Sequence, residues 1–200
     1  MGLKYIHPDQ FISGLSESRY SNYETNDCVV KAFSILFGIS YDEAHGFTRG
    51  FFDRTERNGT GNFSNSMKKL IRNSNFSFNG NVNRVKLNKA FNIKQIQNEF
   101  QLGVYLVVTF DHVTVLCDGV FVDYQNISKP RDLVYEVFEF SDFAHHDEIR
   151  SKIHKKEDSK VGWFFIVVVI LFIGLFDQRD KVERDLIKLK IWIKKEIFKN

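Results

Sequence analysis

The chain has 200 residues, enough for one ordinary domain with a remainder. Its composition, 43% apolar and 26% charged with 21 phenylalanines, is typical of a folded protein and excludes disorder of the whole chain. A net charge of +3 is too small to indicate nucleic-acid binding, and the last 24 residues alone hold eight Lys or Arg against five acids.

The cysteine count and the N-terminus bear on the compartment. Cys28 and Cys117 are too few for a disulfide scaffold and lack the spacing of a metal site, so we expect a reducing, cytoplasmic compartment. The N-terminus has neither the apolar segment nor the small-residue cleavage site of a secretory signal. Ile6 stands where N-myristoylation requires Ser or Thr.

Helical signals fill the first half of the chain. Apolar residues recur at helical spacing from Asn26 to Leu36, and Gly38 is expected to end that helix. Ser40 and Glu43 form a capping-box pattern that starts a second helix, which continues to about Phe47. A loop with glycines at 59 and 61 follows, and further helices are expected at about 63–71 and 93–100, with short strands in the Asn-rich segment between them.

Strand signals follow these helices. Residues 104–126 are rich in β-branched and aromatic side chains, and Asp118-Gly119 supplies a two-residue hairpin turn. Residues 133–140 alternate and predict one more strand. Helices first and strands afterwards indicate an α+β domain, which we place at residues 1–150.

The remaining residues differ in kind from this domain. After a charged linker at 151–160, residues 161–176 carry no charge, which predicts a transmembrane helix and a membrane-associated protein. At about 1.5 Å per residue this segment spans roughly 24 Å, shorter than a bilayer core, so a core helix of an oligomer is the alternative. Residues 177–200 predict a basic amphipathic helix that suits an anionic lipid surface, a partner helix or solvent.

Cys28 is placed in the first turn of the first helix. A cysteine is often simply a buried small hydrophobe, but here the free amides and dipole of a helix start stabilise an anion, which favours a thiolate nucleophile. Such a nucleophile needs an imidazole and an acceptor that orients the imidazole. If Asp118 and Gly119 are the central turn residues, His112 is diagonal to Asp123 on one face of the hairpin, which allows a hydrogen bond.

Two stretches, NDCVVKAFSILFGISYDEAH at 26–45 and VYLVVTFDHVTVLCDGVFVDYQN at 104–126, carry a family resemblance. They resemble the papain-like cysteine peptidases, especially small phage and bacterial proteins related to bacteriocin-leader peptidases. The resemblance covers about residues 20–130. It implies a papain-like fold with Cys28 as nucleophile, His112 as acid and base, and Asp123 as the residue that orients His112. It also implies a phage origin and a possible place in a virion.

This sequence departs from the family pattern at the side chain that would donate to the oxyanion. The family usually has Gln about six residues before the nucleophile, whereas this chain has Asn22 there and Asn26 two residues before Cys28. Either amide could serve, with the backbone N–H of Cys28 as the other donor. Asn26 or Asp27 could instead be the N-cap of the helix.

Other constellations carry less chemistry. His145, His146, Asp147 and His154 lack an evident third metal ligand, so a solvated polar segment is expected and no metal is assigned. Cys117 lies mid-strand and is expected in the core. The Gly59 to Gly61 segment lacks the context of a phosphate loop and predicts a flexible loop at the edge of a substrate groove.

The expected function is hydrolysis of peptide or isopeptide bonds in a peptide or protein substrate, without a cofactor. The same triad also serves acyl transfer. The alternative from another class is a non-catalytic interaction or structural component of a membrane or phage particle that keeps the fold. The sequence leaves substrate specificity, membrane orientation and oligomeric state open.

Overall fold

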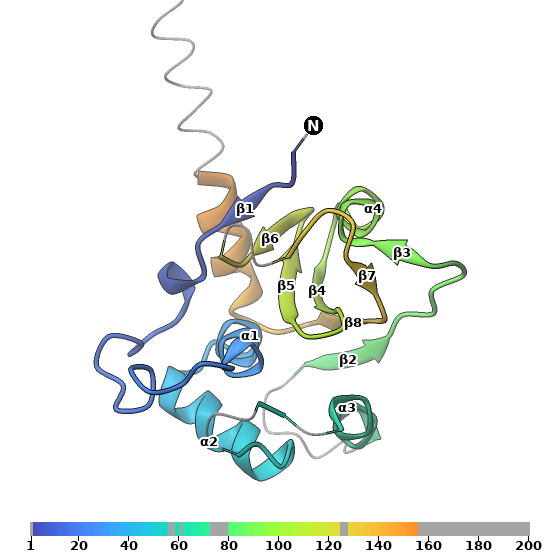
Figure 1. Cartoon of the computed structure of the whole chain (residues 1–200). Helices are drawn as coiled ribbons and strands as arrows, with labels where there is room; N and C mark the ends of the chain where they lie inside the picture. Colours follow the sequence, from blue (N-terminus) through green and yellow to red (C-terminus); the bar gives the residue numbers. More distant parts are fainter. Residues whose placement is uncertain (1, 56–58, 61, 73–79, 125–127, 156–200) are drawn as a thin grey trace, which may run out of the picture. The chain divides into compact units, whose positions relative to one another are not determined.

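The computed structural model describes residues 2–55, 59–60, 62–72, 80–124 and 128–155 (Figure 1). One compact unit comprises Met1–Ile153. It is an α+β fold, as the sequence predicts. In chain order its elements are β1 (Tyr5–Ile6), η1 (Pro8–Phe11), α1 (Cys28–Phe37), α2 (Tyr41–Phe51), α3 (Phe63–Arg72), β2 (Asn81–Arg84), β3 (Phe91–Asn92), α4 (Ile93–Glu99), β4 (Val104–Val108), β5 (Val113–Cys117), β6 (Val120–Val122), β7 (Leu133–Val134) and β8 (Glu136–Ser141).

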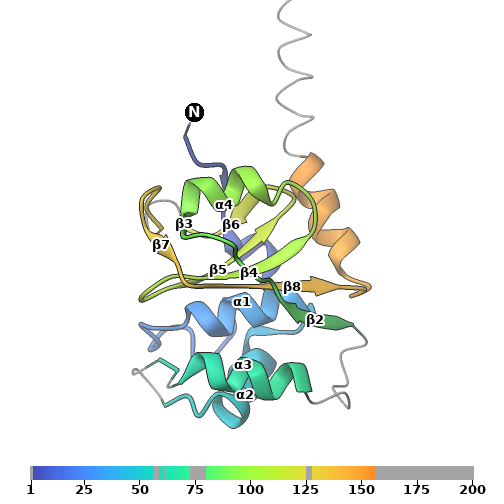
Figure 2. The same cartoon turned by 90° about the vertical axis from the view of Figure 1, so that its right-hand side faces the viewer.

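The main sheet has the strand order β1-β6-β5-β4-β8-β2, in which β1 is parallel to β6 and every other pair is antiparallel. Helices α1, α2 and α3 lie on one face of this sheet, while α4 and the small β3-β7 sheet lie on the other (Figure 2). Because side chains alternate along a strand, the main sheet contributes to two separate cores.

Aromatic side chains hold α1 against the sheet. The ring centroid of Phe33 lies 5.0 Å from that of Phe52 and 6.4 Å from that of Phe140. All three side chains are at most 1% exposed, and burying one such side chain contributes about 1.5–3 kcal/mol. The packing of these buried phenylalanine rings therefore fixes the position of α1, the helix that carries Cys28.

The predicted helices in the described part are confirmed. Gly38 ends α1 in the left-handed conformation, with φ 64°, which a residue without Cβ adopts easily. The capping box is present at Ser40 and Glu43, although α2 continues past Phe47 to Phe51. Helices α3 and α4 begin at the predicted residues and end within one residue of the predicted ends.

The single strand predicted at 133–140 is wrong. It is divided at Tyr135 into β7, which pairs with β3, and β8, which pairs with β4 and β2. The N–H of Tyr135 donates to the carbonyl oxygen of Val108 at 2.9 Å, where the chain passes from one sheet to the other. One alternating segment of the sequence thus contributes strands to two sheets. The two-residue strand β1 was not predicted, because it is too short to show a recognisable alternation.

The C-terminal end of the described part also differs from the expectation. Residues 151–155, expected as the start of a charged linker, continue a helix that begins at residue 146. Ile149 and Ile153, one turn apart, are 4% and 2% exposed and bury this helix against the core.

The predicted transmembrane helix at 161–176 and the basic tail at 177–200 lie outside the described residues, so both stay predictions. None of the helices in the described part has the length and apolarity needed to cross a bilayer.

Candidate active site

Cys28 is the first residue of α1, and its side chain is half-buried beside the core that joins the helix to the sheet. Apart from Lys31 and Ser34, the following residues of α1 are apolar and buried, so they orient the helix against the core. At this position, a sulfur is close to helix amides that have no intrahelical acceptor.

His112 and Asp123 flank the two strands of the predicted hairpin. Asp118 and Gly119 both have positive φ, 45° and 73°, as a two-residue type I′ turn requires. This turn sets the register in which Cys117 pairs with Val120, which is the predicted register. The Nε2 atom of His112, just before β5, lies 2.8 Å from Oδ2 of Asp123, just after β6.

The carboxylate of Asp123 is held on both oxygens. The backbone N–H of Tyr124 donates to Oδ1 at 2.8 Å, and the hydroxyl of Ser128 donates to Oδ2 at 3.3 Å. Asp123 and Ser128 are 5% and 3% exposed, so these bonds are shielded from water. Ser128 was not predicted from the sequence, because nothing in its spacing indicates that the chain returns to Asp123.

The side chain of Cys28 lies close enough to His112 to raise the pKa of the imidazole. Since Nε2 already faces Asp123, Nδ1 is the ring nitrogen that remains for the thiol. Burial lowers the pKa of His112, but the interactions with Asp123 and then Cys28 outweigh burial and raise the pKa to about 10. The raised pKa favours the protonated imidazole beside the sulfur.

A cleft of 390 Å³ lies over these three side chains, between the start of α1 and the ends of β5 and β6. Asn26 also lines it, whereas Asn22 is exposed and is not among its lining residues. The lining residues are Pro8, Glu24, Thr25, Asn26, Asp27, Cys28, Lys31, Ala32, Ile35, Asp111, His112, Val113, Thr114, Val115, Val122, Asp123 and Tyr124.

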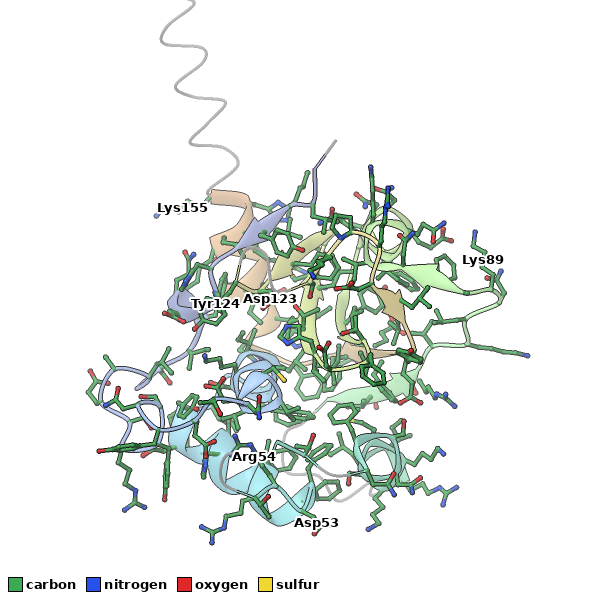
Figure 3. All side chains as sticks on the ribbon, in the orientation of Figure 1. Asp53, Arg54, Lys89, Asp123, Tyr124 and Lys155 are labelled. Carbon is green, nitrogen blue, oxygen red and sulfur yellow. The ribbon has the colours of Figure 1, made fainter. Side chains whose placement is uncertain are left out.

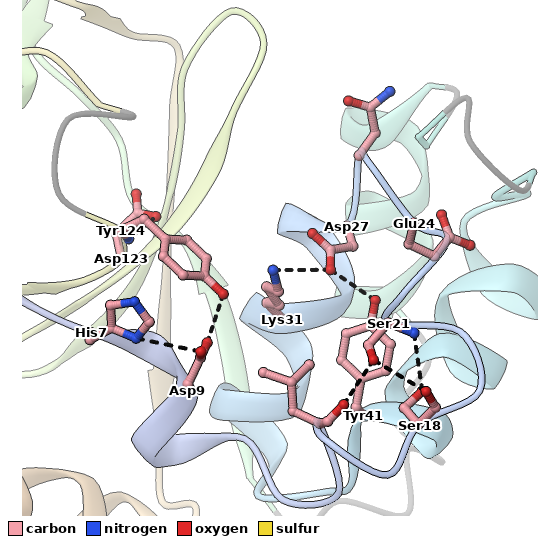
Figure 4. A network of polar contacts seen from close by, with 12 residues as sticks. His7, Asp9, Ser18, Ser21, Glu24, Asp27, Lys31, Tyr41, Asp123 and Tyr124 are labelled. Atoms are coloured by element: carbon pink, nitrogen blue, oxygen red, sulfur yellow. Dashed lines mark hydrogen bonds and ion pairs between the residues drawn. The ribbon is translucent and has the colours of Figure 1, made fainter.

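Asp27 stands at the N-cap of α1, but its side chain does not cap the helix. Oδ2 instead accepts a hydrogen bond from the Tyr41 hydroxyl at 2.8 Å and lies 3.1 Å from Nζ of Lys31 (Figure 4). Burial and then the Asp27 charge raise the pKa of Tyr41, so its hydroxyl remains a donor. The Asp27 carboxylate therefore does not occupy the backbone N–H groups at the start of α1.

Lys31 connects the helix to the sheet at one wall of the cleft. Its Nζ lies 4.6 Å from the centre of the Tyr124 ring, and the Tyr124 hydroxyl donates to Oδ1 of Asp9 at 2.6 Å (Figure 4). Burial lowers the pKa of Lys31, but the contacts with Tyr124 and Asp27 raise it overall. The sequence analysis missed this wall, although the i, i+4 spacing of Asp27 and Lys31 could have indicated their pairing.

The solvated polar segment predicted for His145, His146, Asp147 and His154 is confirmed at Asp147 and His154, which are exposed, and is wrong at the two neighbouring histidines. Nε2 of His145 lies 2.8 Å from the carbonyl oxygen of Ile35, and Nε2 of His146 lies 3.2 Å from that of Leu36. His146 is 3% exposed, whereas His154 is exposed. Half-buried His145 and buried His146 therefore both satisfy carbonyl groups at the end of α1, which have no intrahelical donor.

The remaining expectations have mixed outcomes. Cys117 is fully buried, as predicted, and burial raises its pKa to about 12. Gly59 forms a bridge with Thr55, and Gly61 lies outside the described residues. No group of three or more metal-ligating side chains occurs in the described part of the chain.

Comparisons with family models, with curated proteins and with solved structures find no match for this chain. Its chemistry has to be inferred from the geometry of the cleft.

Proposed function

We propose that this protein is a thiol-dependent hydrolase of peptide or isopeptide bonds with a papain-like fold. The observation that carries the proposal is the position of His112 beside Cys28 and within 2.8 Å of Asp123, with all three side chains lining one cleft. A thiolate, an acid and base, and an orienting carboxylate are the groups that acyl transfer requires. The order of the elements, a helix that begins with cysteine and then a sheet with histidine and aspartate, agrees with the papain-like resemblance.

In the acylation step the Cys28 thiolate attacks the carbonyl carbon of the substrate. A C–S bond forms, and the carbonyl π electrons move to oxygen. The oxyanion then returns its electron pair and expels the amine, which takes a proton from the imidazolium of His112. Asp123 keeps the imidazole oriented and stabilises its charge.

In the second step His112, now neutral, takes a proton from water, and the resulting hydroxide attacks the thioester. The carboxylic acid leaves, and the thiolate and the imidazolium form again. An amine in place of water would give acyl transfer, so adding hydroxylamine and measuring hydroxamate against free acid distinguishes the two outcomes.

The test is the reactivity of Cys28 towards iodoacetamide at pH 7, followed by peptide mass mapping. We expect native labelling at Cys28 and a rate at least about tenfold lower in His112→Ala, because only a paired imidazole maintains the thiolate. Cys117 provides an internal control, since its burial restricts labelling to the denatured protein. Equal labelling of both cysteines, or no effect of His112→Ala, would favour a non-catalytic interaction module.

A further inference from the structure

A buried ion pair lies directly behind the loop that leads into α1. The guanidinium of Arg54 donates to both carboxylate oxygens of Glu24, from Nη1 at 2.9 Å and from Nη2 at 2.7 Å. The side chains of Arg54 and Glu24 are 1% and 3% exposed. A bidentate ion pair that is shielded from solvent is among the most strongly directed contacts in a protein. The reaction steps above do not use this pair.

Two further contacts make this arrangement rigid. Nη2 of Arg54 also donates to the backbone carbonyl oxygen of Asn26 at 3.2 Å, two residues before Cys28. Nε2 of His45 lies 3.0 Å from Oε1 of Glu24, and the His45 ring stacks on Tyr20 with 4.0 Å between centroids. The planar guanidinium is therefore fixed by its partners, and it in turn fixes the peptide group between Asn26 and Asp27.

The direction of this peptide group follows from its planarity. The peptide is trans, so the N–H of Asp27 points opposite to the carbonyl of Asn26 and away from Arg54. Arg54 lies on the α2 side of α1, and Asp123 lies on the other side (Figure 3). Asp27 and Cys28 line the cleft, and no acceptor among the described residues binds the N–H of either one.

We propose that the backbone N–H groups of Asp27 and Cys28 form the oxyanion hole, and that Arg54 is a positioning residue that holds the Asn26–Asp27 peptide in the required orientation. This inference rests on the proposed hydrolase function. The two backbone N–H groups take the place of the Asn22 and Asn26 side chains, which the sequence suggested as oxyanion donors. Two N–H groups that are oriented before the reaction stabilise the carbonyl oxygen as it takes up the electron pair during attack by sulfur.

The experiment compares two reactions of the same thiol. Hydrolysis of p-nitrophenyl acetate passes through an oxyanion, whereas alkylation by iodoacetamide displaces iodide at a saturated carbon and forms none. Lysine cannot reproduce the three hydrogen bonds that Arg54 donates to Glu24 and Asn26. In Arg54→Lys we expect kcat to fall by about tenfold to a hundredfold with KM little changed, because the oxyanion donors lose their orientation. The rate of Cys28 alkylation should stay within about twofold of wild type.

Glu24→Gln provides a second route, because it keeps the shape of the side chain and removes the charge that holds Arg54. We expect the same split between hydrolysis and alkylation. The matched control is Arg84→Lys. Arg84 on β2 forms an ion pair of 2.7 Å with Glu136 on β8, at the edge of the sheet far from β5 and β6. This variant should leave the rates of hydrolysis and alkylation unchanged.

Three results would overturn the inference. One is a wild-type kcat in well-folded Arg54→Lys or Glu24→Gln. Another is an equal fall in hydrolysis and alkylation, which would indicate general loosening of the site. The third is a loss in Asn22→Ala as large as that in Arg54→Lys. A wild-type protein that does not hydrolyse the ester would instead count against the proposed function itself.

Discussion

At the start of α1 the imidazole of His112 lies between a thiol and a carboxylate, whereas at the end of the same helix the imidazoles of His145 and His146 bond to backbone carbonyl groups. The first imidazole faces Cys28 and Asp123 in a cleft, and its pKa rises to about 10. Burial lowers the pKa of both others, that of His146 to about 4 with the help of neighbouring His145. The same side chain thus has a raised pKa at one end of α1 and a lowered pKa at the other, because its partners differ.

The largest expected effect comes from Asp123→Asn, which removes the anionic partner from His112 and keeps the side-chain shape. Because the N–H of Tyr124 needs an acceptor, the asparagine oxygen faces Tyr124 and its NH₂ group faces Nε2 of His112. The imidazole is then held in the tautomer that carries the proton towards Cys28. We expect ester hydrolysis to fall by roughly 10²- to 10⁴-fold, as measured by kcat/KM.

Ser128→Ala is the matched control for this variant, since it removes only the bond of 3.3 Å to the same carboxylate. It should reduce hydrolysis by about tenfold or less. An Asp123→Asn protein as active as Ser128→Ala would show that the carboxylate charge does not support His112.

The two ends of α1 should respond to pH in opposite directions. The pKa of His112 rises from 6.5 in the unfolded chain to about 10 in the fold, so its stabilisation is full below pH 6.5 and is lost as pH rises towards 10. The pKa of His146 falls from 6.5 to about 4, so stability is lost as pH falls from 6.5 towards 4.

Urea denaturation across pH 4 to 10 measures both effects. His112→Gln should flatten the loss of stability on the alkaline side, and His146→Gln should flatten the loss on the acid side. Identical pH profiles for the two variants would contradict the different partners of these imidazoles.

The smallest expected effect is on stability alone, at the C-terminal end of α1. A Cβ on Gly38 would lie 2.7 Å from Cγ of His145, and the backbone there has φ 64°. Gly38→Ala should therefore lower the free energy of unfolding by about 1–2 kcal/mol or more, as measured by urea denaturation.

Gly46→Ala is the control for this change, because Gly46 lies inside α2 and nothing lies within 4 Å of the added Cβ. It should stabilise the protein by about 0.5–1 kcal/mol. Alkylation of Cys28 should be unaffected in both variants. A change in Cys28 reactivity in Gly38→Ala would show that the two ends of the helix are coupled.

The sequence by itself determined the features that depend on neighbours in the chain. The presence of α1, the glycine at its end and the capping box of α2 follow from local hydrogen bonds and apolar spacing, although α1 begins at Cys28 and not at Asn26. The register of β5 and β6, and with it the pair of His112 and Asp123, follows from a two-residue turn, because a tight turn leaves one pairing available.

Only the tertiary structure decided which distant groups meet. Arg54 reaches a carboxylate 30 positions away, and His145 reaches a carbonyl group 110 positions away. Asp27 was expected as a possible cap, but Tyr41 and Lys31 hold its carboxylate elsewhere. Such partners cannot be read from spacing along the chain, because they depend on how the helices pack against the sheet and on which buried charges must be paired.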